Sequence, residues 1–282
     1  MSTAKGHIAR KRTLGSSQKR KVRGAGRRLE VVSTTRGLVV VATLGREENV
    51  AVVQESLKRF DSSSGQWDCL AYSHVPGLDT SRLRLPDGKG CKVEARAGWR
   101  WASLLNLTTP LVVQPYDYVF VLLDDILLHE RMFRIDELMR LQRLHGLSML
   151  SPSVVAASRL TMSPTVSKQL AQVGCVRPVK AIEVFATLFT RRAWECFHEM
   201  FAGDVLATSA TSTGAVGWGY DLCYSAHCGA RGLGGLGVTD SFMAIHTEGP
   251  LSELQFTESL VTRKRQHIAK RLKRQDWTTG SA

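Results

Sequence analysis

Two adjacent carboxylates, Asp124 and Asp125, follow directly on YDYVFVLL, the clearest strand pattern of the chain. Burying a pair of carboxylates without a counter-charge is too costly for a protein core. A divalent cation would supply that counter-charge, because Mg²⁺ and Mn²⁺ prefer carboxylate oxygens and bridge them to phosphates. The alternative is that the two acids cap the following turn or pair with Arg131 or Arg134.

A second candidate segment is the run Gly217, Trp218, Gly219, Tyr220 and Asp221. Glycines let the backbone approach a ligand closely. An exposed Trp218 would offer a flat apolar face on which a sugar ring can stack. Asp221, at the start of the next helix, is placed to act as general base toward a hydroxyl. A tight turn with a buried Trp218 and a capping Asp221 explains the same pattern.

Three further polar residues stand near apolar runs. His246 follows the last predicted strand, and its neutral ring could ligate a metal if it meets Asp125 in space; a structural histidine is the alternative. Glu183 lies among apolar neighbours, so it needs a partner and is either half of a salt bridge or a site residue. Asp240 follows a Gly-rich loop, and we assign it with Glu183 to substrate binding.

The elements that must position these residues alternate between two patterns. Apolar, β-branched runs predict strands at 37–44, 67–73, 116–123, 147–150, 181–189 and 236–245, with Pro152 stopping the fourth. Helical spacing predicts helices at 47–60, 95–107, 136–144 and 190–201. Strand, helix and strand over 37–73 indicate a right-handed parallel βαβ unit. Ligands bind beyond the carboxyl ends of strands in such sheets, which is where the acid pair falls.

The charge of the chain is unevenly distributed. Of its 38 Lys and Arg, ten lie in residues 1–28 and seven in 263–274, which leaves 21 against 24 acids in 29–262. The net charge of +13 therefore belongs to the two ends. We expect a basic disordered tail over 1–33, one folded domain over 34–262 and a second basic tail over 263–282. Such tails are solvated arms with weak affinity for polyanions; targeting, nuclear import or contact with an anionic membrane are the alternatives.

Cysteine spacing and hydropathy indicate which cellular compartment to expect. Six cysteines contain no CxxC pair, so we expect buried free thiols and no structural zinc site, with Cys223 and Cys228 as candidates for a bond. No apolar run reaches the roughly 18–20 residues of a membrane helix. We expect a cytoplasmic protein, or one in an organelle lumen reached through a transit-type N-terminus.

Four segments, in this order, resemble a known family: YDYVFVLLDDI, IEVFATLFTRRAW, GWGYDLCYSAHC and GVTDSFMAIHTEG. They resemble the domain-of-unknown-function family numbered seven-zero-seven, found widely in plants, over roughly residues 37–250. That family is similar to GT-A glycosyltransferases. The resemblance implies an α/β, GT-A-like (Rossmann-like) single domain, with a mixed, mostly parallel sheet flanked by helices.

The resemblance also implies roles for particular residues. Asp124 and Asp125 match the last two positions of a D-x-D-type motif that binds Mn²⁺ or Mg²⁺, with Leu123 at the first position. His246 matches the histidine that completes the metal shell, and Asp221 the acid that deprotonates the acceptor hydroxyl.

The function expected from these assignments is metal-assisted transfer of a sugar from a nucleotide-sugar donor to a hydroxyl acceptor, which could be a glycan, a protein or a small molecule. Leu123 favours an alternative, a catalytically inactive GT-A-like binding protein. A third possibility is a protein that associates with nucleic acid or another polyanion through its basic tails.

Overall fold

The computed structural model describes residues 35–96, 101–155, 176–205 and 220–247. Both predicted tails, Cys175, and Gly217, Trp218 and Gly219 lie outside the described residues. Among the described residues, the strands are β1 Arg36–Leu44, β2 Gln66–Ser73, β3 Lys92–Ala95, β4 Tyr118–Leu122, β5 Ile126–Leu127, β6 Met149–Val154, β7 Val176–Pro178, β8 Ala186–Thr190 and β9 Leu236–His246. The helices are α1 Glu47–Leu57, α2 Trp101–Leu107, α3 Pro110–Val113, α4 Ile135–Leu144, α6 Arg191–Val205 and α7 Tyr220–Gly229, and a 3-10 turn spans Ser62–Ser64.

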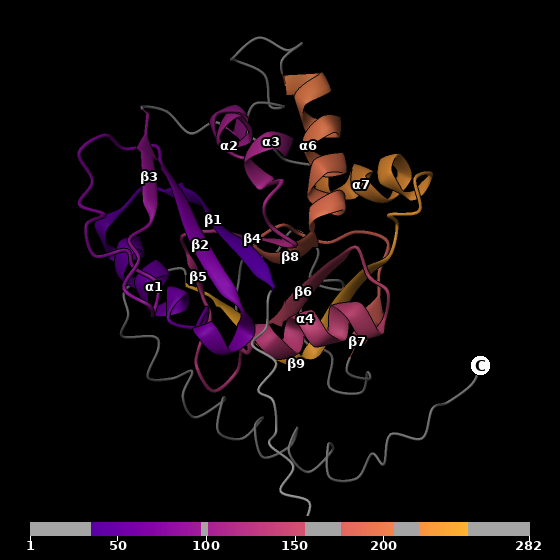
Figure 1. The fold of residues 1–282 in the computed structure, drawn as a ribbon, viewed down its shortest axis with the longest axis horizontal. Coiled ribbons are helices and arrows are strands. Elements are labelled where there is room, and N and C mark those ends of the chain that lie inside the picture. Colours follow the sequence, from indigo (N-terminus) through magenta and orange to yellow (C-terminus); the bar gives the residue numbers. More distant parts are fainter. Residues whose placement is uncertain (1–34, 97–100, 156–175, 206–219, 248–282) are drawn as a thin grey trace, which may run out of the picture. The chain divides into compact units, whose positions relative to one another are not determined.

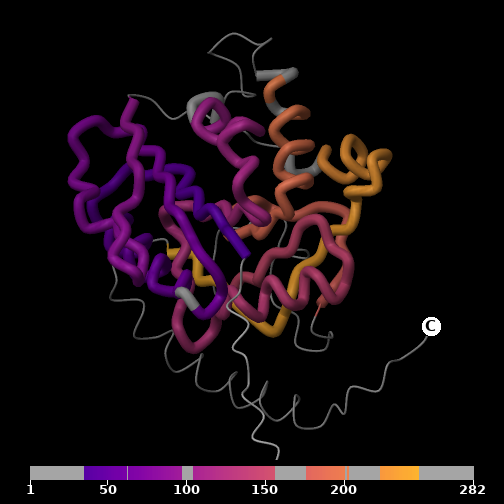
Figure 2. The backbone as a smooth tube through the Cα atoms, in the orientation of Figure 1, coloured from indigo at the N-terminus to yellow at the C-terminus, as the bar shows by residue number. Residues whose placement is uncertain are grey.

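All nine strands form one sheet in the order β3-β2-β1-β4-β8-β6-β9-β5, with β7 also paired to β9 (Figure 1). Strands β1, β2, β3, β4, β6 and β9 run in one direction, and β5, β7 and β8 run against them. The predicted α/β class with a mixed, mostly parallel sheet is therefore confirmed. In Figure 2 the yellow trace of β9 returns to lie beside β5, to which it is hydrogen-bonded.

Helices pack against both faces of the sheet because successive residues of a strand point to opposite sides. On β1, Val39 and Val41 belong to the apolar cluster that contains the buried side chains of α1 and α4. Leu38 and Val40 belong to the other cluster, with side chains of α2, α3, α6 and α7. Strand β1 is therefore buried on both faces, which explains its uninterrupted apolar run.

The prediction that Pro152 stops a strand is wrong, because β6 continues to Val154. The pairing of β6 with β8 has ended by Leu150, and a register shift in its pairing with β9 follows Pro152. Proline is tolerated there because one side of the strand no longer needs its N–H. The strand predicted at 181–189 begins only at Ala186, so Glu183 lies in the turn before β8.

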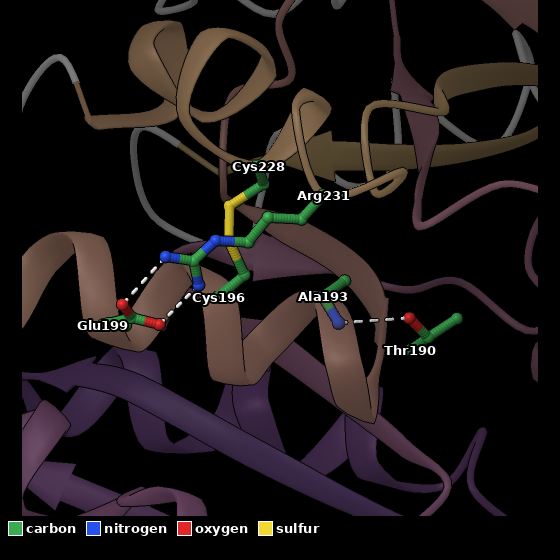
Figure 3. Close-up of a disulfide and its surroundings, with 6 residues drawn as sticks. All are labelled: Thr190, Ala193, Cys196, Glu199, Cys228 and Arg231. Atoms are coloured by element: carbon green, nitrogen blue, oxygen red, sulfur yellow. Dashed lines mark hydrogen bonds and ion pairs between the residues drawn. A yellow bond between two sulfur atoms is a disulfide. The ribbon is translucent and has the colours of Figure 1, made fainter.

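The prediction of free buried thiols is also wrong for four cysteines. Cys69 is bonded to Cys91, and Cys196 is bonded to Cys228, which joins α6 to α7 (Figure 3). Of the two cysteines named as candidates for a bond, Cys228 is bonded and Cys223 is an exposed free thiol. Thr190 caps the start of α6, since the Ala193 amide donates to Thr190 Oγ1 over 3.3 Å (Figure 3).

Within the described ranges, no helix has both the length and the apolar composition needed to cross a bilayer.

Candidate functional site

The candidate site lies at the edge of the sheet where parallel strands end together. Strands β1, β2 and β4 are parallel, so the residues that follow them share one edge. Asp124 and Asp125 come after β4, Gly45 after β1 and His74 after β2. Strand β9 ends at the same edge, where His246 is the partner of Ile126 in β5.

Asp124 is enclosed by the chain that leaves β1. Its Oδ1 accepts a hydrogen bond from Thr43 Oγ1 at 2.9 Å. Its Oδ2 accepts from the Gly45 amide at 3.2 Å and from Asn49 Nδ2 at 2.8 Å. Burial raises the pKa of the Asp124 carboxyl, the hydrogen bond from Asn49 opposes that rise, and the charge of Asp125 adds to it. Only 7% of the residue is exposed, so three donors take the place of water.

Asp125 contacts the end of β9. Its Oδ2 lies 3.0 Å from His246 Nε2, and the exposed fractions of the two side chains are 33% and 13%. Its main-chain carbonyl accepts from the Thr247 amide at 2.7 Å and from Thr247 Oγ1 at 2.8 Å. Its Oδ1 is buried and has no hydrogen-bond partner among the described residues. The structure therefore brings Asp125 and His246 together.

The other predicted site residues have different surroundings. Asp240 Oδ2 lies 2.8 Å from Arg177 Nε, in a buried ion pair that joins β9 to β7. The Glu183 carbonyl accepts from Thr187 Oγ1 at the entrance to β8. Tyr220 and Asp221 open α7, but their side chains lie outside the described part of the structure.

Sequence reasoning missed the residues that surround Asp124. The only signals were a threonine near the end of the apolar run of β1, a glycine just after it, and an asparagine in the first turn of α1. Gly45 is required by a close approach, because a Cβ there would lie 2.2 Å from Cε1 of His74. The Nδ1 of His74 is buried and has no hydrogen-bond partner within the described ranges.

The pair formed by Asp125 and His246 fits a divalent cation that is shared with a substrate. In the described ranges, no three His, Cys, Asp or Glu side chains gather into an all-protein metal site. Mg²⁺ commonly takes only one or two carboxylates from the protein and completes its shell with phosphate and water. Asp125 could supply one such carboxylate, and His246 could add an imidazole.

Comparisons with known proteins give a family but no activity. A family model described as "Protein of unknown function (DUF707)" matches residues 16–279. No curated protein matches the chain. Among solved structures, the chain is similar to one described as "Crystal Structure of A197 from STIV", with 11% identity, coverage of 76% of this chain and 86% of that chain, and a TM-score of 0.39. A similarity this distant carries no argument about the site.

Proposed function

The chain belongs to the DUF707 family, as its motifs predicted, and we propose that it is a nucleotide-sugar-dependent glycosyltransferase acting on a hydroxyl acceptor. The observation that supports this proposal is the pair of Asp125 and His246, 3.0 Å apart at the carboxyl ends of the parallel strands. Ligands of open α/β sheets bind at this edge.

In the proposed site, Asp125 and His246 hold Mn²⁺ or Mg²⁺, which when bound neutralises charge on the departing diphosphate. Asp125 would supply its carboxylate to the cation, and His246 would supply its neutral imidazole. Asp221 takes the proton of the acceptor hydroxyl, and Trp218 stacks on the acceptor sugar. The nucleotide-sugar donor binds to this site through its diphosphate.

A second candidate, a binding protein without transferase activity, is favoured by Leu123. This residue occupies the first position of the acidic motif, and its side chain packs against both apolar clusters. Its amide donates to the Phe185 carbonyl over 2.8 Å. The first position of the motif is thus a partly buried apolar residue that packs against the protein core.

Calorimetric titration of the full chain with UDP and GDP, with and without Mn²⁺, tests the proposal. We expect nucleotide binding that requires Mn²⁺ and is lost in Asp125→Ala. The matched control is Asp136→Ala, which removes a half-exposed acid paired with Arg134 away from this edge. Nucleotide binding that is unchanged by Mn²⁺ or by Asp125→Ala would contradict the metal role.

A donor screen then separates the two candidates. Transfer or slow hydrolysis of a nucleotide sugar by the wild type, abolished in Asp221→Asn without loss of donor binding, supports the transferase. Metal-dependent binding of every donor without turnover supports the binding protein.

A further inference from the structure

We propose that Asp124 is a positioning residue that holds Asp125 toward His246 and does not itself bind the ligand. Its three donors, Thr43, Gly45 and Asn49, form with it what we call the Asp124 clasp. The role of Asp124 in orienting Asp125 toward His246 does not depend on which ligand binds there. The role of Asp125 as a metal ligand rests on the proposed function.

The two neighbouring acids differ in the way this assignment requires. Both oxygens of Asp124 accept hydrogen bonds at 2.8–3.2 Å, and the residue is 7% exposed. Asp125 is 33% exposed, with one oxygen on His246 and the other without a partner among the described residues. Three donors occupy most of the roughly four lone-pair sites of the Asp124 carboxylate and enclose it, which leaves little room for a cation. Asp125 is therefore the acid that can accept a ligand.

The Asp124 clasp links the chain segments at the ends of β1 and β4, beyond the last residues that pair between these strands. The last residues paired between β1 and β4 are Val41 and Leu122. Beyond them no pairing of these strands is present among the described residues, and the clasp joins Thr43, Gly45 and Asn49 to the side-chain carboxylate of Asp124, the residue before Asp125. The hydroxyl comes from the end of β1, the amide from the turn and the carboxamide from the first turn of α1, so the clasp also fixes the start of that helix.

Asp125 is held from its other side by β9. Its carbonyl accepts two hydrogen bonds from Thr247, and Ile126 pairs with His246. The clasp fixes the residue before Asp125, and β9 fixes Asp125 itself. With the backbone held at both points, few orientations remain for the Asp125 side chain, and the one present places Oδ2 on His246.

Asn49→Ala is the informative substitution, because it removes one donor of the clasp and leaves Asp124, Asp125 and His246 unchanged. Thr43→Val removes the hydroxyl with little change of shape. The matched control is Gln54→Ala on the same helix, whose side chain bonds the main chain of Arg84 far from the acids.

Two measurements on the full chain test the proposal. The ring Cε1–H resonance of His246, recorded by NMR at fixed pH, reports its contact with Asp125. Binding of Mn²⁺ alone, followed by the EPR signal of free Mn²⁺, reports the ligand role. In Asn49→Ala and Thr43→Val we expect the resonance to move toward its position in Asp125→Ala, and Mn²⁺ affinity to fall about tenfold, as is typical for outer-shell residues. Gln54→Ala should change neither.

The resonance decides the positioning role by itself. A wild-type resonance in Asn49→Ala, or an equal shift in Gln54→Ala, would overturn the proposal. Failure of the wild type to bind Mn²⁺, with the resonance still shifted in Asn49→Ala, would count against the proposed metal site while supporting the clasp.

The disulfides carry a second, independent inference: we infer that the chain folds in an oxidising compartment, in place of the cytoplasm expected from its sequence. Each bond forms when two thiols give up two protons and two electrons to a disulfide-bearing oxidant, which is reduced to its dithiol. The cytosol keeps thiols reduced, and a chain there would leave Cys196 and Cys228 as adjacent buried thiols at 3% and 0% exposure. Both disulfides require an oxidant: the bond from Cys69 in β2 to Cys91 and the bond between α6 and α7.

Differential alkylation of the chain isolated from the cells that make it tests this inference. Free thiols are blocked with iodoacetamide under denaturing conditions, the bonds are then reduced, and the newly released thiols receive a heavier label. We expect the heavier label on Cys69, Cys91, Cys196 and Cys228 and the lighter label on Cys223, which is the internal control. The lighter label on the four paired cysteines would overturn the inference.

Discussion

The disulfide between Cys196 and Cys228 closes a loop with a sequence separation of 32 residues, and its loss should lower the free energy of unfolding substantially. In the chain-entropy model, a loop of that length contributes about 3.7 kcal/mol at 25 °C by restricting the unfolded chain. Single domains are stable by only about 5–15 kcal/mol in total. Removing this bond should therefore remove a large fraction of the stability.

Other contacts between α6 and α7 cannot compensate for the loss. The ion pair of Glu199 in α6 and Arg231, two residues after the end of α7, lies near the disulfide (Figure 3), but its side chains are 61% and 45% exposed. Solvent screens exposed pairs, which contribute little. The contact between the rings of Phe197 and Tyr224, with centroids 6.3 Å apart, remains in either state and does not replace a covalent link.

Urea unfolding followed by circular dichroism measures the effect. The variant is Cys196→Ala with Cys228→Ala, because changing both residues leaves neither partner of the bond as a new unpaired thiol. The control is Cys223→Ala, which removes an exposed free thiol and should leave the midpoint unchanged. A loss below about 1 kcal/mol at an unchanged slope would refute the loop-closure reasoning for this bond.

Three further changes have defined outcomes. Asp240→Asn leaves the buried guanidinium of Arg177 without this carboxylate, so it should lower the free energy of unfolding in urea by about 3–5 kcal/mol. The double change of Asp240→Leu and Arg177→Met should recover most of that loss. Equal losses in the single and double variants would contradict this account. Gly45→Ala should lower the melting temperature, because the new Cβ would lie 2.2 Å from the ring of His74, and His74→Ala should restore it; a failure of that rescue would show that the ring is not the obstacle. Burial raises the pKa of Tyr116 to about 12, so the folded state keeps a proton that the unfolded state loses near pH 10. The free energy of unfolding should therefore fall between pH 10 and 12 in the wild type, and fall less in Tyr116→Phe. An ultraviolet titration of this tyrosine near pH 10 in the folded protein would contradict the prediction.

The features predictable from sequence were those encoded by neighbouring residues. The run GLVVVATL predicted β1 because a strand buried on both faces needs an unbroken apolar sequence. The position of the acid pair followed from the rule that ligands of α/β sheets bind beyond strand ends. His246 could be named as a possible partner of Asp125 for the same reason, since Asp125 follows β4, His246 ends β9, and the two strands run in the same direction.

The features that escaped prediction depend on residues far apart in the chain. Asn49 lies 75 positions from Asp124, and no local pattern connects an asparagine in a first helical turn to a carboxylate in the turn after β4. The bonded cysteines are separated by 22 and 32 residues, and spacing alone does not say which of six thiols meet. Pro152 was misjudged because its tolerance depends on where the neighbouring strand ends.

The bonds from Thr247 to the Asp125 carbonyl span 122 residues, and this separation has a consequence for synthesis of the chain. A ribosome delivers Asp125 long before β9, at roughly 5–20 residues per second, so the growing chain carries the acids for several seconds without their partner. Strand β4 must also wait for β8, which lies beyond α4 and β6 in the sequence. The site is therefore among the last parts of the sheet to form, and a nascent chain that ends before β9 contains Asp125 without His246.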